Sequence, residues 1–88
     1  MFRIVEKTEL AAGIFRMRVE APRVAASALP GQFVIVRADE QGERVPLTVA
    51  DYDRTAGTVT IVTQTIGVST RKICALEAGD ALADFAFI

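Results

Sequence analysis

Apolar and polar residues alternate along most of this chain, and a period of two residues is the repeat of a β-strand with one buried face. In the segment 15–21, four apolar residues alternate with two arginines and a glutamate. Val, Ile and Thr, which favour strands because they are branched at Cβ, supply 25 of the 88 residues. The sequence therefore predicts a mostly-β fold.

Turn signals separate the alternating segments. Gly13 lies in the first turn, and Pro22 ends the second segment because proline has no N–H to donate to a ladder. Pro30 and Gly31 mark a further turn, and the alanine-rich residues 23–29 are expected to be the connection that leads to it. The strands predicted in this way lie at residues 2–10, 15–21, 32–37, 44–51, 58–65 and 80–88.

One segment departs from the alternation. Residues 68–76 combine a small polar start with helix formers, and Gly79 supplies a stop signal. Short antiparallel strands leave no exposed edge when their sheet closes on itself. We therefore expect an all-β fold, a six-stranded antiparallel Greek-key β-barrel with one short α-helix between the fifth and sixth strands.

Charge and composition exclude several classes of function. Ten Lys and Arg residues against eleven Asp and Glu residues give a net charge of −1, which argues against a dedicated nucleic-acid binder. The chain has no histidine and a single cysteine, Cys74, so it cannot by itself form a disulfide, a Cys-rich zinc site, a Cys-ligated iron–sulfur cluster or a histidine-based triad. Cys74 is expected to be a small buried residue.

The sequence also indicates where in the cell the protein is found. The longest uncharged stretch, residues 55–70, is rich in Thr and Gly, so we expect no membrane span. Residues 1–7 alternate and carry an acid early, unlike a signal peptide. A cytoplasmic protein is therefore expected.

The segment 44–48, with the sequence RVPLT, places a proline inside a predicted strand. Pro46 cannot donate to a ladder, so this backbone could face a ligand instead of a neighbouring strand. Arg44 and Thr48 are four residues apart, which puts a cation and a hydroxyl on one face of a strand. The spacing alone fits an edge strand with a solvated arginine equally well or better.

The segment 67–70, with the sequence GVST, opens the predicted helix. Free N–H groups and the positive end of the helix dipole can bind an anion, and Gly67 allows a phosphate to approach closely. An ordinary surface helix capped by Ser69 or Thr70 would look the same. The preceding residues, Val62, Thr63 and Gln64, could offer backbone groups and an amide to a polar ring, or could simply be a half-exposed strand end.

Taken in order, the motif PGQFV at residues 30–34, RVPLT at 44–48 and GVST at 67–70 resembles the FAD-binding domain of the ferredoxin-NADP reductase superfamily. Within that superfamily the chain is similar to the electron-transfer subunits of NADH-dependent ferredoxin:NADP oxidoreductase and of dihydroorotate dehydrogenase. The resemblance covers essentially the whole chain.

The resemblance implies a barrel that holds FAD on its outer surface. It matches Arg44 to an arginine that pairs with the FAD diphosphate, and it places Pro46 and Leu47 along the isoalloxazine. Thr48 matches a hydroxyl residue that hydrogen-bonds near flavin N5. The second flavin-contacting strand and the phosphate loop would be supplied by Val62, Thr63, Gln64, Gly67, Ser69 and Thr70.

Members of this superfamily continue into a nicotinamide-binding domain, and some also carry a Cys-rich segment for a 2Fe–2S cluster. We expect residues 1–88 to be the FAD-binding domain alone, a half enzyme that works with NAD(P)H and an iron–sulfur electron-transfer subunit only in the full-length protein. Core surface exposed at the end of the chain is expected to favour self-association.

A barrel of this kind also serves as a non-enzymatic binding or assembly module, because fold alone does not fix function. Such a module would not need the segment 44–48 together with the helix start at Gly67. The combination of the two segments favours the flavoprotein.

Overall fold

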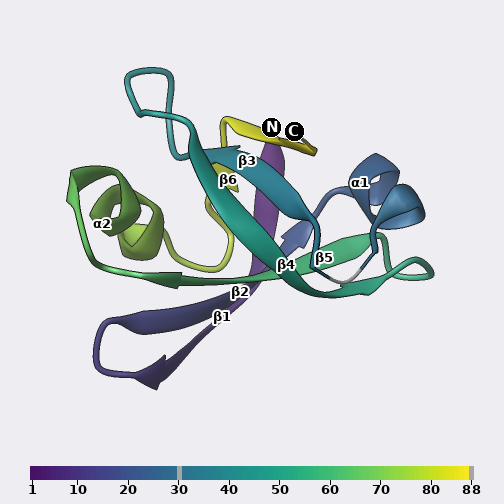
Figure 1. Ribbon diagram of the computed structural model, residues 1–88, viewed down its shortest axis with the longest axis horizontal. Coiled ribbons are helices and arrows are strands. Elements are labelled where there is room, and N and C mark those ends of the chain that lie inside the picture. The colour runs from purple at the N-terminus through teal and green to yellow at the C-terminus, as the bar shows by residue number, and fades with distance from the viewer. Residues whose placement is uncertain (30, 88) are drawn as a thin grey trace.

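The computed structural model describes residues 1–29 and 31–87, and its strands form one antiparallel β-sheet (Figure 1). The strands are β1 (Phe2–Ala11), β2 (Ile14–Glu20), β3 (Phe33–Arg37), β4 (Val45–Asp53), β5 (Thr58–Gln64), β6 (Ala81–Leu82) and β7 (Asp84–Phe87). The helices are α1 (Pro22–Ser27) and α2 (Val68–Ala75). Neighbouring strands follow the order β6-β1-β2-β5-β4-β3-β7.

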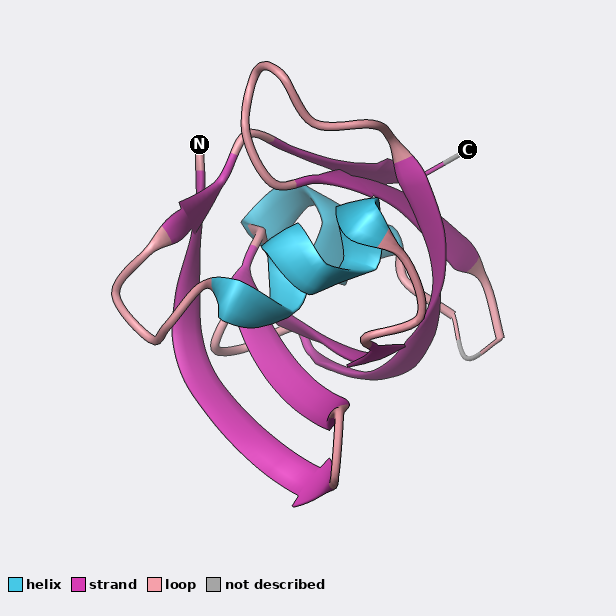
Figure 2. Ribbon diagram, turned by 90° about the vertical axis from the view of Figure 1, so that its left-hand side faces the viewer, coloured by secondary structure: helices cyan, strands magenta, loops and turns pink. Residues whose placement is uncertain are grey.

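The sheet closes into a nearly complete barrel because its last segment is shared between its two edges. β6 pairs with β1, whereas β7 pairs with β3, and only Ala83 separates β6 from β7. The N–H of Ala83 donates to the carbonyl of Arg37 at 2.9 Å, so the junction is itself hydrogen-bonded. Figure 2 shows the resulting ring of strands, seen along the barrel with the helices in the middle.

The predicted all-β, antiparallel and nearly closed barrel is confirmed, but the count of six strands is wrong. The predicted strand at 80–88 is divided at Ala83, since its first half follows β1 and its second half follows β3. Its last residue, Ile88, lies outside the described residues, as does Pro30 of the predicted Pro30–Gly31 turn. In the sheet order, β2 lies beside β5. The Greek-key connectivity of the barrel stays a prediction.

The prediction of a single helix is also wrong, because residues expected to be a connection form α1. Pro22 occupies the first turn, where its fixed φ suits a helix and its missing N–H costs nothing. Alanine has the highest helix propensity, and Val24 and Ala25 bury one side of this short helix. Neither helix of the described chain has the length and apolar surface needed to cross a bilayer.

The interior of the barrel is filled by alternating residues of the strands and by α2. The largest fully buried side chains include Phe85, Ile4, Met17, Ile61 and Ile73. Ile73 comes from α2, so this helix is packed onto the core rather than lying loosely on the surface. The position of α2 is therefore fixed by burial of its inner face.

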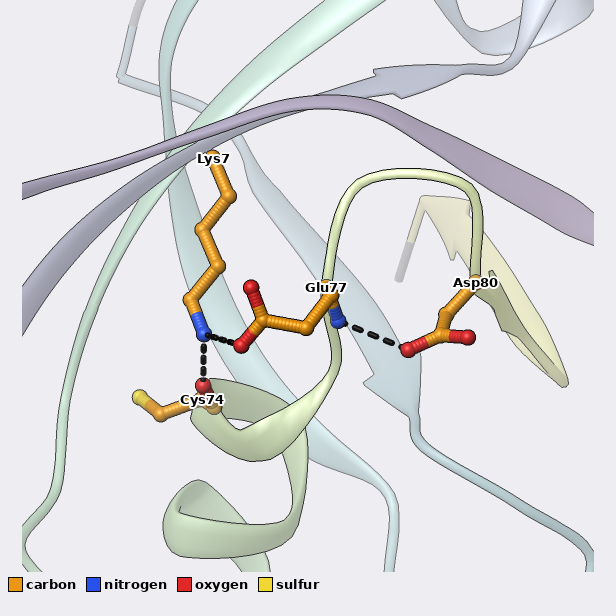
Figure 3. Close-up of polar contacts among 4 residues, drawn as sticks. All are labelled: Lys7, Cys74, Glu77 and Asp80. Carbon is orange, nitrogen blue, oxygen red and sulfur yellow. Dashed lines mark hydrogen bonds and ion pairs between the residues drawn. The ribbon is translucent and has the colours of Figure 1, made fainter.

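Lys7 of β1 holds the C-terminal end of α2 (Figure 3). Its Nζ donates to the Cys74 carbonyl at 2.5 Å and to Glu77 Oε1 at 2.9 Å, and only 12% of the side chain is exposed. A cation at this end satisfies a free carbonyl and complements the helix dipole. In the loop that follows, Asp80 Oδ2 accepts a hydrogen bond from the Glu77 N–H at 2.7 Å.

Candidate cofactor-binding site

β4 and β5 separate at one end of the barrel. β4 pairs with β5 only from Val49 onward, whereas the preceding residues 45–48 pair with β3 alone. On the other side of the gap, residues 62–64 pair only with β2. The strands part into a cavity of about 360 Å³, which is lined by Ile14, Val45, Pro46, Leu47, Thr48, Val62, Thr63, Gln64, Ile66 and Thr70.

Two features of β4 explain why the strands separate. Pro46 lies opposite Ile35 in the β3 ladder and has no N–H to offer toward β5. Beyond it, the register between β4 and β5 shifts between Val49 and Asp51, which marks a β-bulge. The backbone of β4 is therefore paired on one side only, as the proline predicted, and its other side faces the cavity.

Side chains along β4 alternate as the sequence predicts. Pro46 and Thr48 are exposed, Val45 and Leu47 are half-buried, and Val49 is buried. The outer face of β4 therefore presents a rigid apolar ring and a hydroxyl group next to the gap.

The facing strand end alternates in the same way. Val62 and Gln64 are exposed, but Thr63 is only 2% exposed and its Oγ1 has no hydrogen-bond partner within the described residues. Thr63 shares its parity with Val59 and Ile61, so its side chain turns toward the core. Of the three predicted residues, Val62 and Gln64 present their side chains to the outside.

The start of α2 adjoins this cavity. The Thr70 hydroxyl accepts hydrogen bonds from the N–H groups of Ile66 (3.1 Å) and Gly67 (2.9 Å), which fixes the turn into the helix. Gly67 is the N-cap residue, and having no side chain it cannot accept a hydrogen bond from the first-turn N–H groups. A Cβ at Gly67 would meet no atom within 4 Å, so the space in front of the helix start is open.

A second cavity, of about 380 Å³, continues from the first over the helix start. The two share Ile66 and Thr70, so together they form an elongated strip. The second cavity is lined by Gln41, Gly42, Glu43, Ile66, Gly67, Val68, Ser69, Thr70 and Lys72. Polar and apolar groups line the second cavity about equally, whereas the first cavity is mainly apolar. This gradient suits a ligand with a ring at one end and a charged group at the other.

The loop between β3 and β4 forms the outer wall of the second cavity. The Ser69 hydroxyl donates to Glu43 Oε2 at 3.3 Å, and Lys72 Nζ lies 3.8 Å from Asp39 Oδ2. The loop therefore contacts α2 through one hydrogen bond and one ion pair, both of them exposed.

Arg44 lies immediately before β4 and lines neither cavity. One of its guanidinium nitrogens is 3.2 Å from Asp84 Oδ2, and 62% of its side chain is exposed. Asp84 belongs to β7, which lies on the far side of β3 from the gap. Of the predicted residues, Arg44 is thus the one that the structure does not bring to the strip.

Sequence reasoning missed several residues of the strip. Ile14 lies there because β2 pairs it with Gln64, a long-range contact that no local pattern announces. Ile66 lines both cavities and is 78% exposed. Its position between a predicted strand and the glycine before the helix could have indicated that it lies at the site. Glu43 lies between the strands predicted at residues 32–37 and 44–51, and no motif singled it out.

Cys74 is buried in α2, as predicted, and burial raises the pKa of its thiol. A protonated, buried thiol is a poor nucleophile. Among the described residues no group of three or more His, Cys, Asp or Glu side chains is arranged to hold a metal ion.

Comparison with known proteins supports the fold and the family. No family model matches the chain. Over 85 residues it is 59% identical to an uncharacterized protein in the adh 3′ region of Clostridium beijerinckii, a match that covers 97% of this chain and 29% of that protein. Over 81 residues it is 38% identical to a homologue of the dihydroorotate dehydrogenase B (NAD(+)) electron transfer subunit from Thermotoga maritima, covering 92% and 29% of the two chains.

The electron transfer subunit of dihydroorotate dehydrogenase B from Shouchella clausii is 32% identical over 79 residues, 86% of this chain and 30% of that protein. A solved structure of NADH-dependent reduced ferredoxin-NADP oxidoreductase, reported for flavin-based electron bifurcation, superimposes with a TM-score of 0.93 at 36% identity. It covers 98% of this chain and 31% of the solved one. The chain thus spans about three-tenths of the length of these relatives. The resemblance predicted from the motifs is confirmed: over nearly its whole length the chain is similar to about three-tenths of ferredoxin-NADP reductase-like electron-transfer subunits.

Proposed function

We propose that residues 1–88 are the FAD-binding domain of an NAD(P)H:ferredoxin-type electron-transfer subunit. The observation that carries the proposal is the strip formed by the gap between β4 and β5 and the uncapped start of α2, which continues from a mainly apolar cavity to one with a larger polar share. FAD has this same polarity, an aromatic ring system joined to a diphosphate.

The residues present fit the ring system. Pro46 and Leu47 offer apolar surface on β4, and the exposed Thr48 hydroxyl can donate to or accept from a ring nitrogen such as N5. Val62 and Gln64 provide the opposite wall. A cavity of about 360 Å³ lies within the usual range for small-molecule sites, roughly 300–1,000 Å³.

The residues present also fit the diphosphate. The first-turn N–H groups of α2 and its positive dipole end face open space at Gly67. Ser69 and Lys72 add a hydroxyl group and a cation at the rim once they leave Glu43 and Asp39, while the hydroxyl of Thr70 shapes the turn into the helix. The family arginine, Arg44, would complete this set after leaving its partner Asp84.

A bound flavin supplies a centre that exchanges two electrons with a nicotinamide and one electron with an iron–sulfur carrier. In the proposed role the chain binds and orients that centre: β4 holds the ring, and α2 holds the diphosphate. NAD(P)H and the iron–sulfur subunit are proposed as partners of the full-length protein, in the cytoplasm.

The test is a titration of the purified chain with FAD, followed by visible absorption and flavin fluorescence, next to the spectrum of the protein as isolated. We expect saturable binding of one FAD per chain. Thr48→Val keeps the size of the side chain and removes the hydroxyl, so it should shift the flavin absorption bands and weaken binding of FAD and riboflavin alike. A chain that binds neither flavin, and whose stability does not respond to FAD, would instead favour a binding or assembly module.

A further inference from the structure

Asp84 is shared between two arginines. Its Oδ2 lies 2.8 Å from Arg37 Nε and 3.2 Å from a guanidinium nitrogen of Arg44. Arg37 is 20% exposed at its side chain and also donates to the Glu40 carbonyl at 3.2 Å, whereas the side chain of Arg44 is 62% exposed. The side chain of Arg37 is therefore the more confined of the two, whereas Arg44 is mostly exposed and has one ion-pair partner among the described residues.

The strand registers explain how the cluster forms. β3 pairs Arg37 with Asp84 of β7 on one side and Val36 with Val45 of β4 on the other. Continuing that register by one residue puts Arg44 opposite Arg37, and like charges facing each other across a ladder are destabilising. The Asp84 carboxylate relieves this repulsion, and to reach it the Arg44 side chain extends over β3 toward β7.

That direction leads away from the candidate site. In the sheet order β5-β4-β3-β7, the gap lies between β4 and β5, on the opposite side of β4 from Asp84. Arg44 lines neither cavity, although the neighbouring Glu43 lines the second one, so we expect the guanidinium to leave Asp84 in order to reach a diphosphate at the start of α2.

We infer that Asp84 is an internal competitor for Arg44, which holds the guanidinium away from the site until a ligand diphosphate takes it. This inference rests on the proposed function and adds a step to it, the exchange of Arg44 from a carboxylate to the ligand. The exchange is easy because exposed ion pairs are weak, and a diphosphate offers more acceptor oxygens than one shared carboxylate. Arg37 remains beside Asp84 after the exchange, because its Nε lies 2.8 Å from the buried Oδ2, although the two atoms do not meet the geometry of a hydrogen bond.

Asp84→Asn tests the inference because it removes the competing charge and leaves a side chain of the same shape. We expect FAD to bind about fivefold more tightly, the equivalent of roughly 1 kcal/mol for an exposed pair. Riboflavin, which has no phosphate, should bind with unchanged affinity. Both are measured by fluorescence titration at fixed ionic strength.

Two controls separate competition for Arg44 from a general change in charge. Glu40→Gln removes one negative charge from the loop between β3 and β4 without touching Arg44, and it should leave FAD affinity nearly unchanged. In an Arg44→Gln background, Asp84→Asn should bring no gain, since the double-mutant cycle isolates the coupling of the two residues.

Asp84→Asn leaves Arg37 without its partner and could unfold the chain, so a compensated variant is needed. Arg37→Gln combined with Asp84→Asn removes the pair as a unit, keeps the net charge and still releases Arg44. This variant should show the same gain for FAD over riboflavin.

The outcomes are distinct. A gain for FAD that disappears without Arg44 supports the inference. Unchanged or weaker FAD binding in both Asp84 variants overturns it, while flavin binding by the wild-type chain would leave the proposed function standing. Failure of the wild-type chain and of every variant to bind any flavin overturns both.

Discussion

The two helices lie at opposite ends of the barrel (Figure 1), and neither helix start has a side-chain cap, but α1 begins with a proline whereas α2 is preceded by a glycine. At α1, Pro22 removes one free N–H, and Arg54 donates to the carbonyls of Ala26 (3.3 Å) and Ala28 (2.9 Å) beyond the last turn. At α2, Lys7 holds the C-terminal end, whereas the start has no side-chain cap and faces open space.

The two ends of this small domain therefore differ in role: the α1 end serves the structure, and the α2 end is open to a ligand. Backbone N–H groups at a helix start need a partner, which can be a side chain, water or a ligand. At α1, Pro22 removes one of the N–H groups that would need a partner, and the helix start lines an apolar cavity. The α2 end combines an uncapped helix start with a strand, β4, that is paired on one side only, so both elements keep hydrogen-bonding groups for something other than the chain.

The largest effect is expected at the cations that hold the two helix ends. Lys7→Met removes two hydrogen bonds of a side chain that is 12% exposed, and should lower the free energy of unfolding by about 2–3 kcal/mol. Arg54→Met removes the corresponding bonds of α1 at a more exposed position, and should cost about 1 kcal/mol. Urea denaturation measures both; equal costs would contradict the ranking.

The next effect concerns the glycine that packs against α1. Gly57 has a φ of +71°, and a Cβ there would lie 3.2 Å from Pro22 Cγ. Gly57→Ala should therefore destabilise the fold by about 1–2 kcal/mol, through backbone strain and crowding. The shift in urea midpoint should appear without any change in the ratio of FAD to riboflavin affinity; a change in that ratio would show that the two ends are coupled.

Gly67→Ala is the matched substitution at the start of α2, and the expected result is reversed. Its φ of −161° is extended backbone that alanine adopts, and nothing lies within 4 Å of the added Cβ, so stability should change by less than about 0.5 kcal/mol. FAD affinity should fall about tenfold because the methyl group takes the space of a phosphate. Unimpaired FAD binding would remove the diphosphate from this position.

The smallest effect concerns pH. Burial raises the pKa of the Cys74 thiol above its ordinary value of 9.0, so above that pH the folded chain binds more protons at this group than the unfolded chain does. Stability contributed by the protonated thiol is fully present below pH 9 and should be lost as the pH rises through the folded-state pKa. Urea denaturation between pH 8 and 10 should show this decline in the wild-type chain and a weaker one in Cys74→Ala; identical profiles would exclude Cys74 as the cause.

Local patterns predicted the features of this molecule that are local. Alternation located the strands, Pro46 indicated a strand with one free side, and Gly67 indicated a helix start. The features that were missed depend on distant parts of the chain. The division of the last strand at Ala83 follows from the closure of the barrel, and the partner of Arg44 is brought beside it by β7.

Two other results could have been read more closely from the sequence. Thr63 follows Val59 and Ile61 at a spacing of two residues, and alternate residues of a strand point to the same face. The inward direction of its side chain could therefore have been predicted from the sequence. The alanine-rich segment after Pro22 carried a helix signal that its short length concealed.

The central claim is that FAD lies along the gap between β4 and β5 and ends at the start of α2. An amide NMR titration of the chain with FAD tests it most directly, because each backbone N–H reports on its own surroundings. We expect shifts concentrated in residues 45, 47, 48, 62–64 and 67–70, with the last group silent when riboflavin replaces FAD. Shifts centred on α1, or the same shifts with both flavins, would contradict it.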